Sequence, residues 1–351
     1  MGYLTVNDMI IDIEDPQSLS NYLNEKNLLG SSELPEIKVL SGGVSNKTML
    51  VKHPSGESWV IKQALPQLRV EAEWFSDPRR IHLEALGLRH VSKFIPPHSV
   101  PEFVFEDFDQ HILIMKAVPE PHSNWKTMLL NGNVKQTHIQ FFATLLAQIH
   151  SRSFALSELM KKVFHDYYFF ESLRLSPYYE YTANQVQLAA EFLQKLCDET
   201  RQIRICVVHG DYSPKNMLVY NDQLVLLDYE VIHFGDPAFD VGFSSTHLLS
   251  KAHHLENHRN QYQNAARLYW DVYSGEVSKD IVSHNFEKRC VKHTLACLLA
   301  RVAGKSTLEY LSPIERERQK LVVLELIENL PNTMPWLITD FIDRITKHAS
   351  H

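Results

Sequence analysis

The sequence His209-Gly210-Asp211-Tyr212-Ser213-Pro214-Lys215-Asn216-Met217-Leu218-Val219 carries the most information about how this chain folds. A short apolar run leads into it, and Asn216 follows Asp211 by five residues. A second apolar run, 224–227, ends at another carboxylate, Asp228. Two short strands would bring these three polar side chains to one end of a small ribbon.

Asp211, Asn216 and Asp228 have the residue types that phosphoryl transfer requires. Carboxylate and amide oxygens are hard ligands for Mg²⁺, which binds few protein groups and keeps phosphate oxygens and water. We expect Asn216 and Asp228 to hold the metal and Asp211 to accept the proton of an attacking hydroxyl. Kinases divide the work in this way. The alternative, that Asp211 caps a turn and Asp228 ends a strand, does not account for the spacing of all three groups.

The same stretch resembles the catalytic loop of the aminoglycoside phosphotransferase and choline kinase superfamily, whose members are protein-kinase-like enzymes acting on small molecules. His209-Gly210-Asp211 stands where protein kinases have His-Arg-Asp, and Asp228-Tyr229-Glu230 stands where they have Asp-Phe-Gly. The segment 235–240, Gly-Asp-Pro-Ala-Phe-Asp, resembles one that follows the metal-binding Asp in that superfamily. No Ala-Pro-Glu sequence or long activation segment follows, which argues against a protein substrate.

The resemblance implies an α+β class and a bilobal protein-kinase-like fold. Residues 1–117 would form an N-lobe with an antiparallel sheet and a helix that bind nucleotide. Residues 118–351 would form a larger, mainly helical C-lobe with the catalytic loop, the metal site and the substrate pocket. ATP and Mg²⁺ are the implied cofactors.

A glycine turn between two strands is expected near residue 42. The adjacent Gly42 and Gly43 allow backbone N–H groups to approach phosphate oxygens closely, although a plain hairpin turn is the alternative. The segment resembles the Ser-Gly-Gly-x-Ser-Asn loop of the superfamily, so Ser45 and Asn46 are also candidates for nucleotide binding.

Lys62 ends the next expected strand. In kinases a lysine at this place contacts the α- and β-phosphates and pairs with a glutamate on the following helix. The helix expected after Pro78 carries Glu84 beside its apolar face, and we predict that Glu84 is the partner. Glu71 and Glu73 are the alternatives.

The apolar run 112–115 predicts a buried central strand. The residues that follow would form a hinge, with adenine bound by backbone groups of Met115, Ala117 and Val118. Within the catalytic loop, Lys215 is placed to steady the γ-phosphate.

Two segments resemble the methylthioribose kinases in particular. They are Val-Ile-Lys-Gln-Ala-Leu-Pro at 60–66 and the Arg-Ile-x-x-Glu-Ala-Leu pattern at 80–86. Two adjacent arginines in those kinases are associated with the sugar, whereas here Ala300 precedes Arg301. Arg301 is therefore a candidate substrate residue, and methylthioribose itself is placed in doubt.

The phosphate acceptor is left open between a sugar, an amino alcohol, an aminoglycoside and a hydroxylated amino acid. Cationic acceptors would need an acidic pocket, for which Asp166, Glu171 and Glu180 are candidates. In a helical stretch expected over 243–275, His247, His254 and His258 could share a face and bind metal. No carboxylate or cysteine pattern accompanies them, so a solvated face is expected.

The composition bounds the other partners. The chain has 351 residues and a formal net charge of −7, which makes nucleic acid an improbable partner. Its four cysteines lack metal or redox spacing, which fits a reducing compartment. No signal peptide or membrane-spanning run is recognised. A cytoplasmic protein is expected, and nothing indicates an oligomeric state.

These observations predict an ATP- and Mg²⁺-dependent kinase that phosphorylates a hydroxyl group of a small molecule. A methylthioribose or related sugar kinase is one specific form of this prediction. A catalytically inactive, nucleotide-binding pseudokinase is the alternative from another class. The complete set of Lys62, Asp211, Asn216 and Asp228 argues against the pseudokinase.

Overall fold

The computed structural model describes residues 10–30, 34–40, 45–69, 74–282 and 285–349. These residues form two compact units, which we describe separately. Unit 1 contains the described residues up to Arg89 together with Pro101–Pro119. Unit 2 contains His90–Val100 and the described residues from Glu120 onward. The first unit is built on an antiparallel sheet and the second is mainly helical, which confirms the predicted α+β class.

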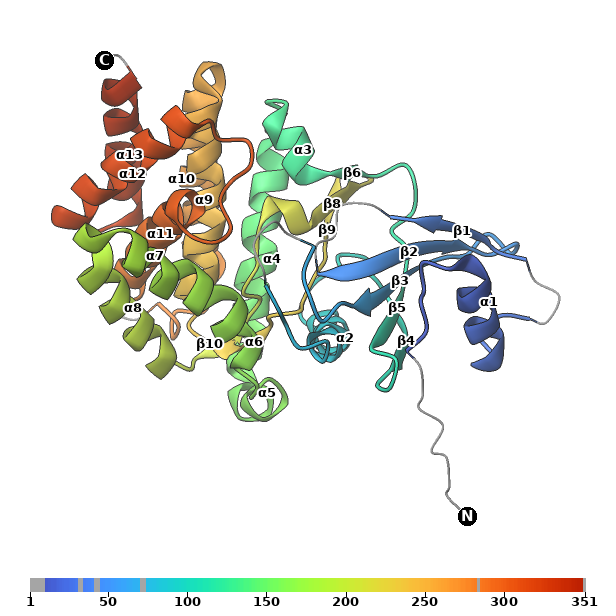
Figure 1. The fold of residues 1–351 in the computed structure, drawn as a ribbon. Coiled ribbons are helices and arrows are strands. Elements are labelled where there is room, and N and C mark those ends of the chain that lie inside the picture. Colours follow the sequence, from blue (N-terminus) through green and yellow to red (C-terminus); the bar gives the residue numbers. More distant parts are fainter. Residues whose placement is uncertain (1–9, 31–33, 41–44, 70–73, 283–284, 350–351) are drawn as a thin grey trace. The chain divides into compact units, whose positions relative to one another are not determined.

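The elements of unit 1 follow one another along the first third of the chain (Figure 1), and the last residues of α2 pass into unit 2. They are α1 (Pro16–Glu25), β1 (Glu36–Val39), β2 (Asn46–Lys52), β3 (Ser58–Ala64), α2 (Arg80–Val91), β4 (Phe103–Asp107) and β5 (Ile112–Lys116). All neighbouring strands are antiparallel, in the order β1-β2-β3-β5-β4. The apolar strand β5 therefore lies inside the sheet, between β3 and β4, as its sequence predicts.

The core of unit 1 forms between one face of the sheet and α1. Residues of β2 and β3 alternate between the core and the other face, so that Met49, Val51 and Ile61 are buried with Leu19 and Leu23 of α1. This alternation is the expected consequence of the two-residue period of a strand. The helix begins at a proline, preceded by an aspartate whose carboxylate accepts from two backbone N–H groups of the first turn.

Unit 2 contains the remaining helices and five short strands. They are β6 (Ser123–Asn124), α3 (Trp125–Leu130), α4 (Gln136–Ala155), α5 (Ser157–Val163), α6 (Tyr168–Phe170), the π-helix η1 (Glu171–Glu180), α7 (Tyr181–Gln185), the 3₁₀ turn η2 (Gln187–Ala189), α8 (Ala190–Gln202), β7 (Cys206–Val208), the 3₁₀ turn η3 (Pro214–Asn216), β8 (Met217–Tyr220), β9 (Gln223–Leu226), β10 (His233–Gly235), α9 (Ala238–His254), the 3₁₀ turn η4 (Glu256–His258), α10 (Arg259–Glu276), α11 (Phe286–Ala303), α12 (Pro313–Glu328) and α13 (Met334–Ala349).

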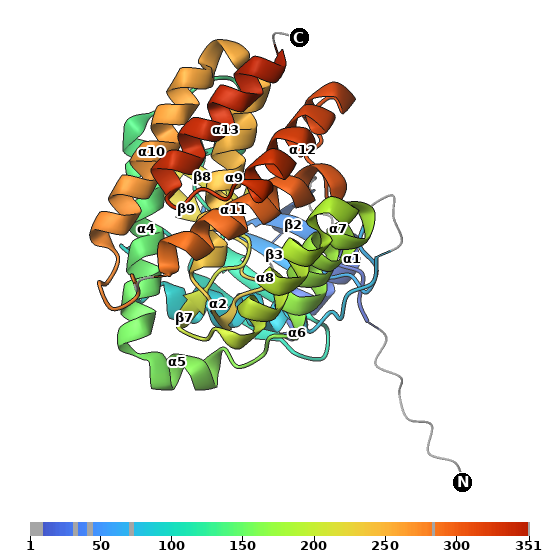
Figure 2. The ribbon, with the colours of Figure 1, turned by 90° about the vertical axis from the view of Figure 1, so that its left-hand side faces the viewer.

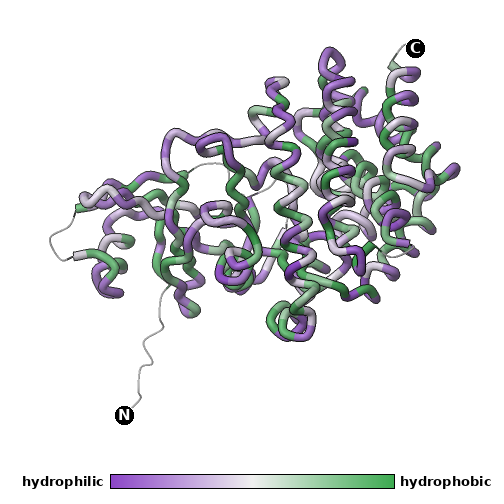
Figure 3. The backbone as a smooth tube through the Cα atoms, turned by 180° about the vertical axis from the view of Figure 1, so that it is seen from behind, coloured by the Kyte–Doolittle hydropathy of each residue, from purple (hydrophilic) through white to green (hydrophobic). Residues whose placement is uncertain are grey.

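The helix α9 is the centre of unit 2. It packs against α10, α11, α12 and α13, which lie around it in Figure 2. Every residue from Ala238 to His253 is buried as a result. The outer helices instead carry alternating hydrophobic and hydrophilic residues along their length (Figure 3), as expected for helices with one solvated face.

The single helical stretch predicted over 243–275 is two helices, α9 and α10, separated by η4. The predicted solvated histidine face is also wrong for His247, which is 6% exposed. The physical reason is that neighbouring helices cover α9 on several sides, so polar residues on this helix are enclosed. His254 and His258 at its end remain partly exposed.

Two small sheets of unit 2 frame the segment from 209 to 228. The strand β7 pairs with β10, and β8 lies between β6 and β9. The hairpin between β8 and β9 turns through Asn221 and Asp222, both with positive φ, as short polar residues often do.

All four cysteines are free and buried, and all lie in unit 2, at positions 197, 206, 290 and 297. No helix in the described ranges is long and apolar enough to cross a membrane.

Candidate active site

The loop after β7 is held at its base by one buried carboxylate, that of Asp240 on α9. Its Oδ2 accepts from the backbone N of His209 at 2.7 Å, and its Oδ1 accepts from that of Gly210 at 2.8 Å. Gly210 has a φ of 77°, and a Cβ there would lie 2.9 Å from the carbonyl oxygen of Val231. Only glycine fits this turn without displacing its neighbours.

The electrostatic surroundings of Asp240 keep it ionised. Burial alone would raise the pKa of Asp240, but the hydrogen bond with His150 and the backbone hydrogen bond from His209 outweigh it, so the net pKa is lowered. The Nε2 of His150 lies 3.3 Å from Asp240 Oδ2, and both side chains are fully buried. His150 is therefore a structural residue.

His209 also has a structural role. Its Nε2 donates to the carbonyl of Leu227 at 3.2 Å, and its Nδ1 accepts from the backbone N of Asp211 at 3.2 Å. Burial lowers the pKa of His209, which favours the neutral ring that this pair of bonds requires. Both ring nitrogens are thus occupied in fixing the loop.

The structure brings the three polar groups predicted from the sequence to one place. Asn216 donates from Nδ2 to Asp211 Oδ2 at 2.8 Å and to the Asp211 carbonyl at 3.0 Å. The carbonyl of Asn216 accepts from the backbone N of Leu227 at 2.9 Å, which places the next residue, Asp228, beside it. Asp228 has a φ of 68°, in the left-handed region that non-glycine residues rarely adopt. Such conformations concentrate at functional sites.

This group suits a divalent cation with few protein ligands. Because the Nδ2 of Asn216 donates to Asp211, its Oδ1 is left to act as an acceptor. An amide oxygen and the Asp228 carboxylate are the donor types that Mg²⁺ takes together with phosphate and water. No cluster of three or more His, Cys, Asp or Glu suited to a metal occurs among the residues that the structure describes.

Arg174, on the π-helix η1, also contacts this group of residues and was not predicted from the sequence. Its Nη2 lies 3.0 Å from Asp211 Oδ2, and its Nε donates to the carbonyl of Gly210 at 2.9 Å. The Arg174 side chain is only 9% exposed. Burial opposes its charge, but Asp211, Tyr178 and two further carboxylates raise the pKa of Arg174 above its ordinary value. It precedes the loop by more than thirty residues, in a segment rich in aromatic side chains, so no local spacing indicates the contact.

In unit 1, Lys62 and Glu84 form an ion pair. The Nζ of Lys62 on β3 lies 2.5 Å from Oε1 of Glu84 on α2, and the side chains are 15% and 1% exposed. Glu84 is thus the residue that meets the strand lysine. The alternatives Glu71 and Glu73 lie outside the described residues.

The predicted phosphate loop is only partly described, since Gly42 and Gly43 lie outside the described residues. Ser45 and Asn46 follow them and are buried, and the Asn46 amide donates to Ser45 Oγ at 3.2 Å. The carbonyl of Ser45 accepts from the backbone N of Leu65 at 3.0 Å.

Some backbone groups of the predicted hinge, residues 115–118, already form hydrogen bonds with neighbouring strands of the sheet. The backbone N of Ala117 donates to the carbonyl of Ser58 at 2.8 Å. Met115 is a paired residue of β5. Of the backbone groups predicted to bind adenine, the N–H of Val118 and the carbonyl of Ala117 are the ones that these contacts leave for a ligand.

The remaining candidates lie in unit 2. Lys215 is exposed, and its backbone carbonyl accepts from Asn124. Arg301 on α11 donates from Nη1 to the hydroxyl of Tyr178 at 3.0 Å and to Ser306 Oγ at 2.8 Å. Tyr178 therefore lies between Arg301 and Arg174, since its ring centroid is 5.8 Å from each guanidinium carbon.

The carboxylates considered for an acidic substrate pocket are occupied elsewhere. Glu171 pairs with Arg201 at 2.5 Å, and Glu180 pairs with the same guanidinium. Asp166 accepts from the backbone N of Tyr168 at 2.8 Å. These contacts give no support to a site for a cationic acceptor.

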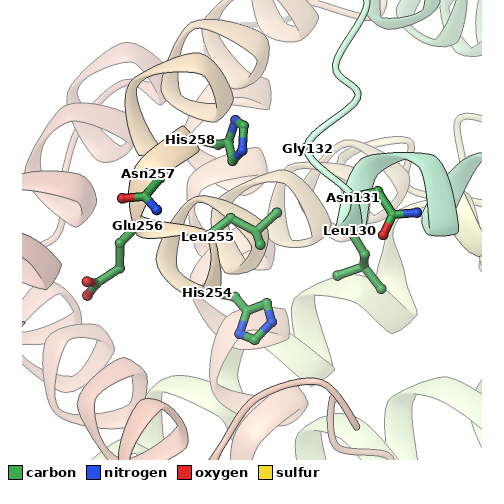
Figure 4. Close-up of a pocket in the computed structure, with 8 residues that line it drawn as sticks. All are labelled: Leu130, Asn131, Gly132, His254, Leu255, Glu256, Asn257 and His258. Atoms are coloured by element: carbon green, nitrogen blue, oxygen red, sulfur yellow. The ribbon is translucent and has the colours of Figure 1, made fainter.

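A separate cavity of about 440 Å³ opens in unit 2. It is lined by residues from the end of α3 and from the turn between α9 and α10 (Figure 4), and none of them belongs to the catalytic loop. His254 contacts Glu315 at 2.8 Å and His258 contacts Gln261 at 3.2 Å, so both rings have protein partners. The cavity is not the predicted site.

The chain is similar both to the model of a protein family and to individual enzymes. The model of the phosphotransferase enzyme family matches residues 36–273. Methylthioribose kinase from Yersinia pseudotuberculosis is 25% identical over 241 residues, which cover 60% of this chain and 58% of that enzyme. Methylthioribose kinase 1 from Oryza sativa is 26% identical over 294 residues, 75% of this chain and 67% of that enzyme. The chain thus spans less than two thirds of the length of the Yersinia relative.

Two solved structures share the fold. Amicoumacin kinase, in complex with AMP-PNP, Ca²⁺ and its ligand, superposes with a TM-score of 0.58 at 12% identity, covering 90% of this chain and 94% of that one. The streptomycin–ATP–APH(2")-IIa ternary complex superposes with a TM-score of 0.50 at 14% identity, covering 89% and 97%. At these identities the similarity establishes the fold alone.

Proposed function

This chain belongs to the phosphotransferase enzyme family, and we propose that it transfers the γ-phosphate of ATP to a hydroxyl group of a small molecule. The observation that carries the proposal is the meeting of Asp211, Asn216 and Asp228 in one loop system. The intact ion pair of Lys62 with Glu84 supports a working nucleotide site rather than a pseudokinase.

Asp211 is the proposed base. Its Oδ2 is held by Arg174 and Asn216, so its other oxygen would accept the proton of the substrate hydroxyl. The hydroxyl oxygen then forms the new bond to the γ-phosphorus, and the bond to the β,γ-bridging oxygen breaks to release ADP. Positioning and charge neutralisation provide most of the acceleration in such reactions.

The other residues bind and orient the nucleotide in this proposal. Lys62 would neutralise the α- and β-phosphates, and backbone groups near Val118 would bind adenine. Lys215 would contact the γ-phosphate. Mg²⁺, held by Asn216 and Asp228, would supply positive charge to the phosphate oxygens.

Methylthioribose is one candidate acceptor, because the curated relatives that match this chain are methylthioribose kinases. Ala300 stands where the first of two sugar-associated arginines would be expected, and Arg301 contacts Tyr178 and Ser306. The proposal is therefore made at the level of a small-molecule kinase. Four buried thiols support a reducing compartment, such as the cytoplasm.

The test is ADP release from Mg·ATP in the presence of methylthioribose, other pentoses, choline, ethanolamine, homoserine and aminoglycosides, each with the Asp211→Asn variant as the control. Stimulation by one compound, lost in the variant, would support the proposal. ATP binding measured by calorimetry, with no turnover by any acceptor, would favour a pseudokinase. Absence of ATP binding would overturn the kinase proposal.

A further inference from the structure

Unit 2 contains a group of cationic side chains that the proposed reaction does not use. We call it the basic cluster, and it consists of Lys126 on α3, His247 and Lys251 on α9, and Arg301 on α11. Burial is the main cause that lowers the pKa of Lys251, and the charges of Lys126 and Arg301 lower it further. They and Lys215 likewise lower the pKa of His247.

Lys251 is the unusual member of the cluster. Its side chain is 0% exposed, and its Nζ donates only to the carbonyl of His247, at 3.3 Å. The aromatic ring of Tyr310 lies 5.4 Å from the same Nζ. In the described part of the chain, no carboxylate lies within ion-pair distance of it. A buried ammonium group without a counter-charge is costly, and proteins usually pair such groups.

Other donors in the cluster also lack partners. The Nε of Arg301 and the hydroxyl of Tyr310 are buried, and neither has a hydrogen-bond partner among the described residues. The carboxylate of Glu309 pairs with Lys126. Among the described residues, Lys251 and Arg301 have no carboxylate within ion-pair distance, and two donors remain unsatisfied.

The cluster is connected to the catalytic loop by direct contacts. Arg301 donates to the Tyr178 hydroxyl, and the Tyr178 ring adjoins Arg174, which pairs with Asp211. On the other side, Ser244 of α9 donates to the carbonyl of Tyr212 at 2.9 Å. The cluster and the proposed base are therefore joined by a short series of side-chain contacts within unit 2.

We propose that the basic cluster binds an anionic group of the phosphate acceptor, so that the acceptor is a hydroxylated acid bearing a carboxylate or a phosphate. This inference rests on the proposed kinase function and narrows its substrate class. An anion would supply the missing counter-charge of Lys251 and accept from Arg301 and Tyr310. Glu171 and Glu180, the carboxylates considered for a cationic acceptor, are already paired with Arg201.

The first experiment measures anion binding without turnover. The thermal midpoint of the full chain is followed at pH 6.5 while sodium phosphate replaces sodium chloride at constant ionic strength. Phosphate should stabilise the wild type and the control variant Lys195→Met, whose lysine is exposed on α8. Lys251→Met should need roughly 10-fold more phosphate for the same shift in thermal midpoint, because it loses one charge-assisted contact with the anion.

Lys251→Met has a second expected signature. Because it removes a buried, unpaired charge, its midpoint without phosphate should be higher than that of the wild type. Arg301→Gln provides an independent variant should Lys251→Met not fold. Absence of a phosphate-specific rise in the thermal midpoint of the wild type would overturn the inference. An equal rise in the wild type, Lys251→Met and Arg301→Gln would show that phosphate binds elsewhere, and would also overturn it.

The second experiment uses matched acceptors in the ADP-release assay. Glycerate and glycerol 3-phosphate are compared with glycerol, and gluconate is compared with glucose. The acids should be preferred, and Lys251→Met should raise their KM roughly 10-fold with little change in kcat. The KM values of glycerate and glycerol 3-phosphate show whether the cluster prefers a carboxylate or a phosphate.

The outcomes separate the two proposals. Turnover of neutral or cationic alcohols that Lys251→Met does not affect would overturn the anionic substrate and leave the kinase function standing. Phosphate binding that depends on Lys251, without turnover of any acceptor, would support the anion site and count against the kinase function.

Discussion

The guanidinium of Arg174 lies 3.0 Å from the Oδ2 of Asp211, and both side chains are largely buried. Asn216 donates to the same oxygen at 2.8 Å. Two donors on one oxygen fix the orientation of the carboxylate, and no described residue donates a hydrogen bond to its Oδ1. The proposed base thus has one oxygen for orientation and one for the substrate proton.

Replacing Asp211 by Asn should reduce kcat by at least about 10²-fold, the contribution of a well-placed general base. The amide can still contact Arg174, so the variant should fold and bind nucleotide. Steady-state ADP release and calorimetric ATP binding measure the two effects. Asp198→Asn, at an exposed surface pair, is the matched control. Full activity of the Asp211 variant would exclude the assigned base.

Arg174→Met should destabilise unit 2 by about 3 kcal/mol, because it leaves a buried carboxylate without its cation. It also removes the donor to the Gly210 carbonyl and should lower kcat more than it changes the KM for ATP. Arg174→Lys should recover part of both losses by restoring the charge. Urea unfolding and kinetics of the three proteins provide the measurement. A wild-type kcat in Arg174→Met would show that the residue is only structural.

Asp228→Ala should abolish Mg²⁺-dependent nucleotide binding, because the side chain is a proposed metal ligand. Titration of ATP with and without Mg²⁺ measures the difference directly. Asp222→Ala, in the exposed hairpin turn of the same ribbon, should leave it unchanged. Equal Mg·ATP affinity in Asp228→Ala and the wild type would contradict the metal assignment.

Asp240 should make the stability of unit 2 sensitive to acid. Its folded pKa lies below the ordinary 3.8, so its stabilising effect is complete above that pH and is lost as pH falls through the lower folded value. Asp240→Asn should lower stability at pH 6 by about 1–3 kcal/mol, since one amide oxygen replaces two acceptors for the loop N–H groups. Urea unfolding between about pH 2 and pH 5, the range in which the contribution is lost, should show a flatter profile in the variant.

Lys251 should produce a pH dependence of the same sign as Asp240, but at higher pH. Burial and the charges of Lys126 and Arg301 lower the pKa of Lys251 from 10.5 to about 7, although the charge of Glu309 opposes this shift. The unfolded chain then binds a proton that the folded chain lacks between these values, so stability should rise with pH across this window. His247 on the same helix carries little charge there, since its own pKa is lowered. Lys251→Met should remove the rise, and an unchanged pH profile would contradict this assignment.

The approach of Asp211, Asn216 and Asp228 could be predicted because these residues are close in the sequence. Asp211 and Asn216 are five residues apart, and Asp228 follows the next apolar strand, so spacing alone predicted that they meet. The pairing of Lys62 with Glu84 followed from the order of strand and helix.

Arg174 and Lys251 could not be found in the same way. Arg174 reaches the loop through a π-helix whose local pattern is aromatic, and its contact with Asp211 depends on tertiary packing. Lys251 belongs to a helix with a mixed polar pattern, which predicts a solvated face. Four neighbouring helices enclose it instead, and no periodicity in α9 itself reveals their presence.

The placement of all four cysteines within unit 2, and their burial, makes thiol chemistry a selective reporter. Maleimide labelling would follow the opening of the helical unit alone, because unit 1 has no sulfhydryl to react. The five tryptophans are divided between the units, with Trp59 and Trp74 in unit 1 and the other three in unit 2, so their fluorescence would report on both. Comparing labelling rates with fluorescence would therefore show whether the two units unfold together or in sequence.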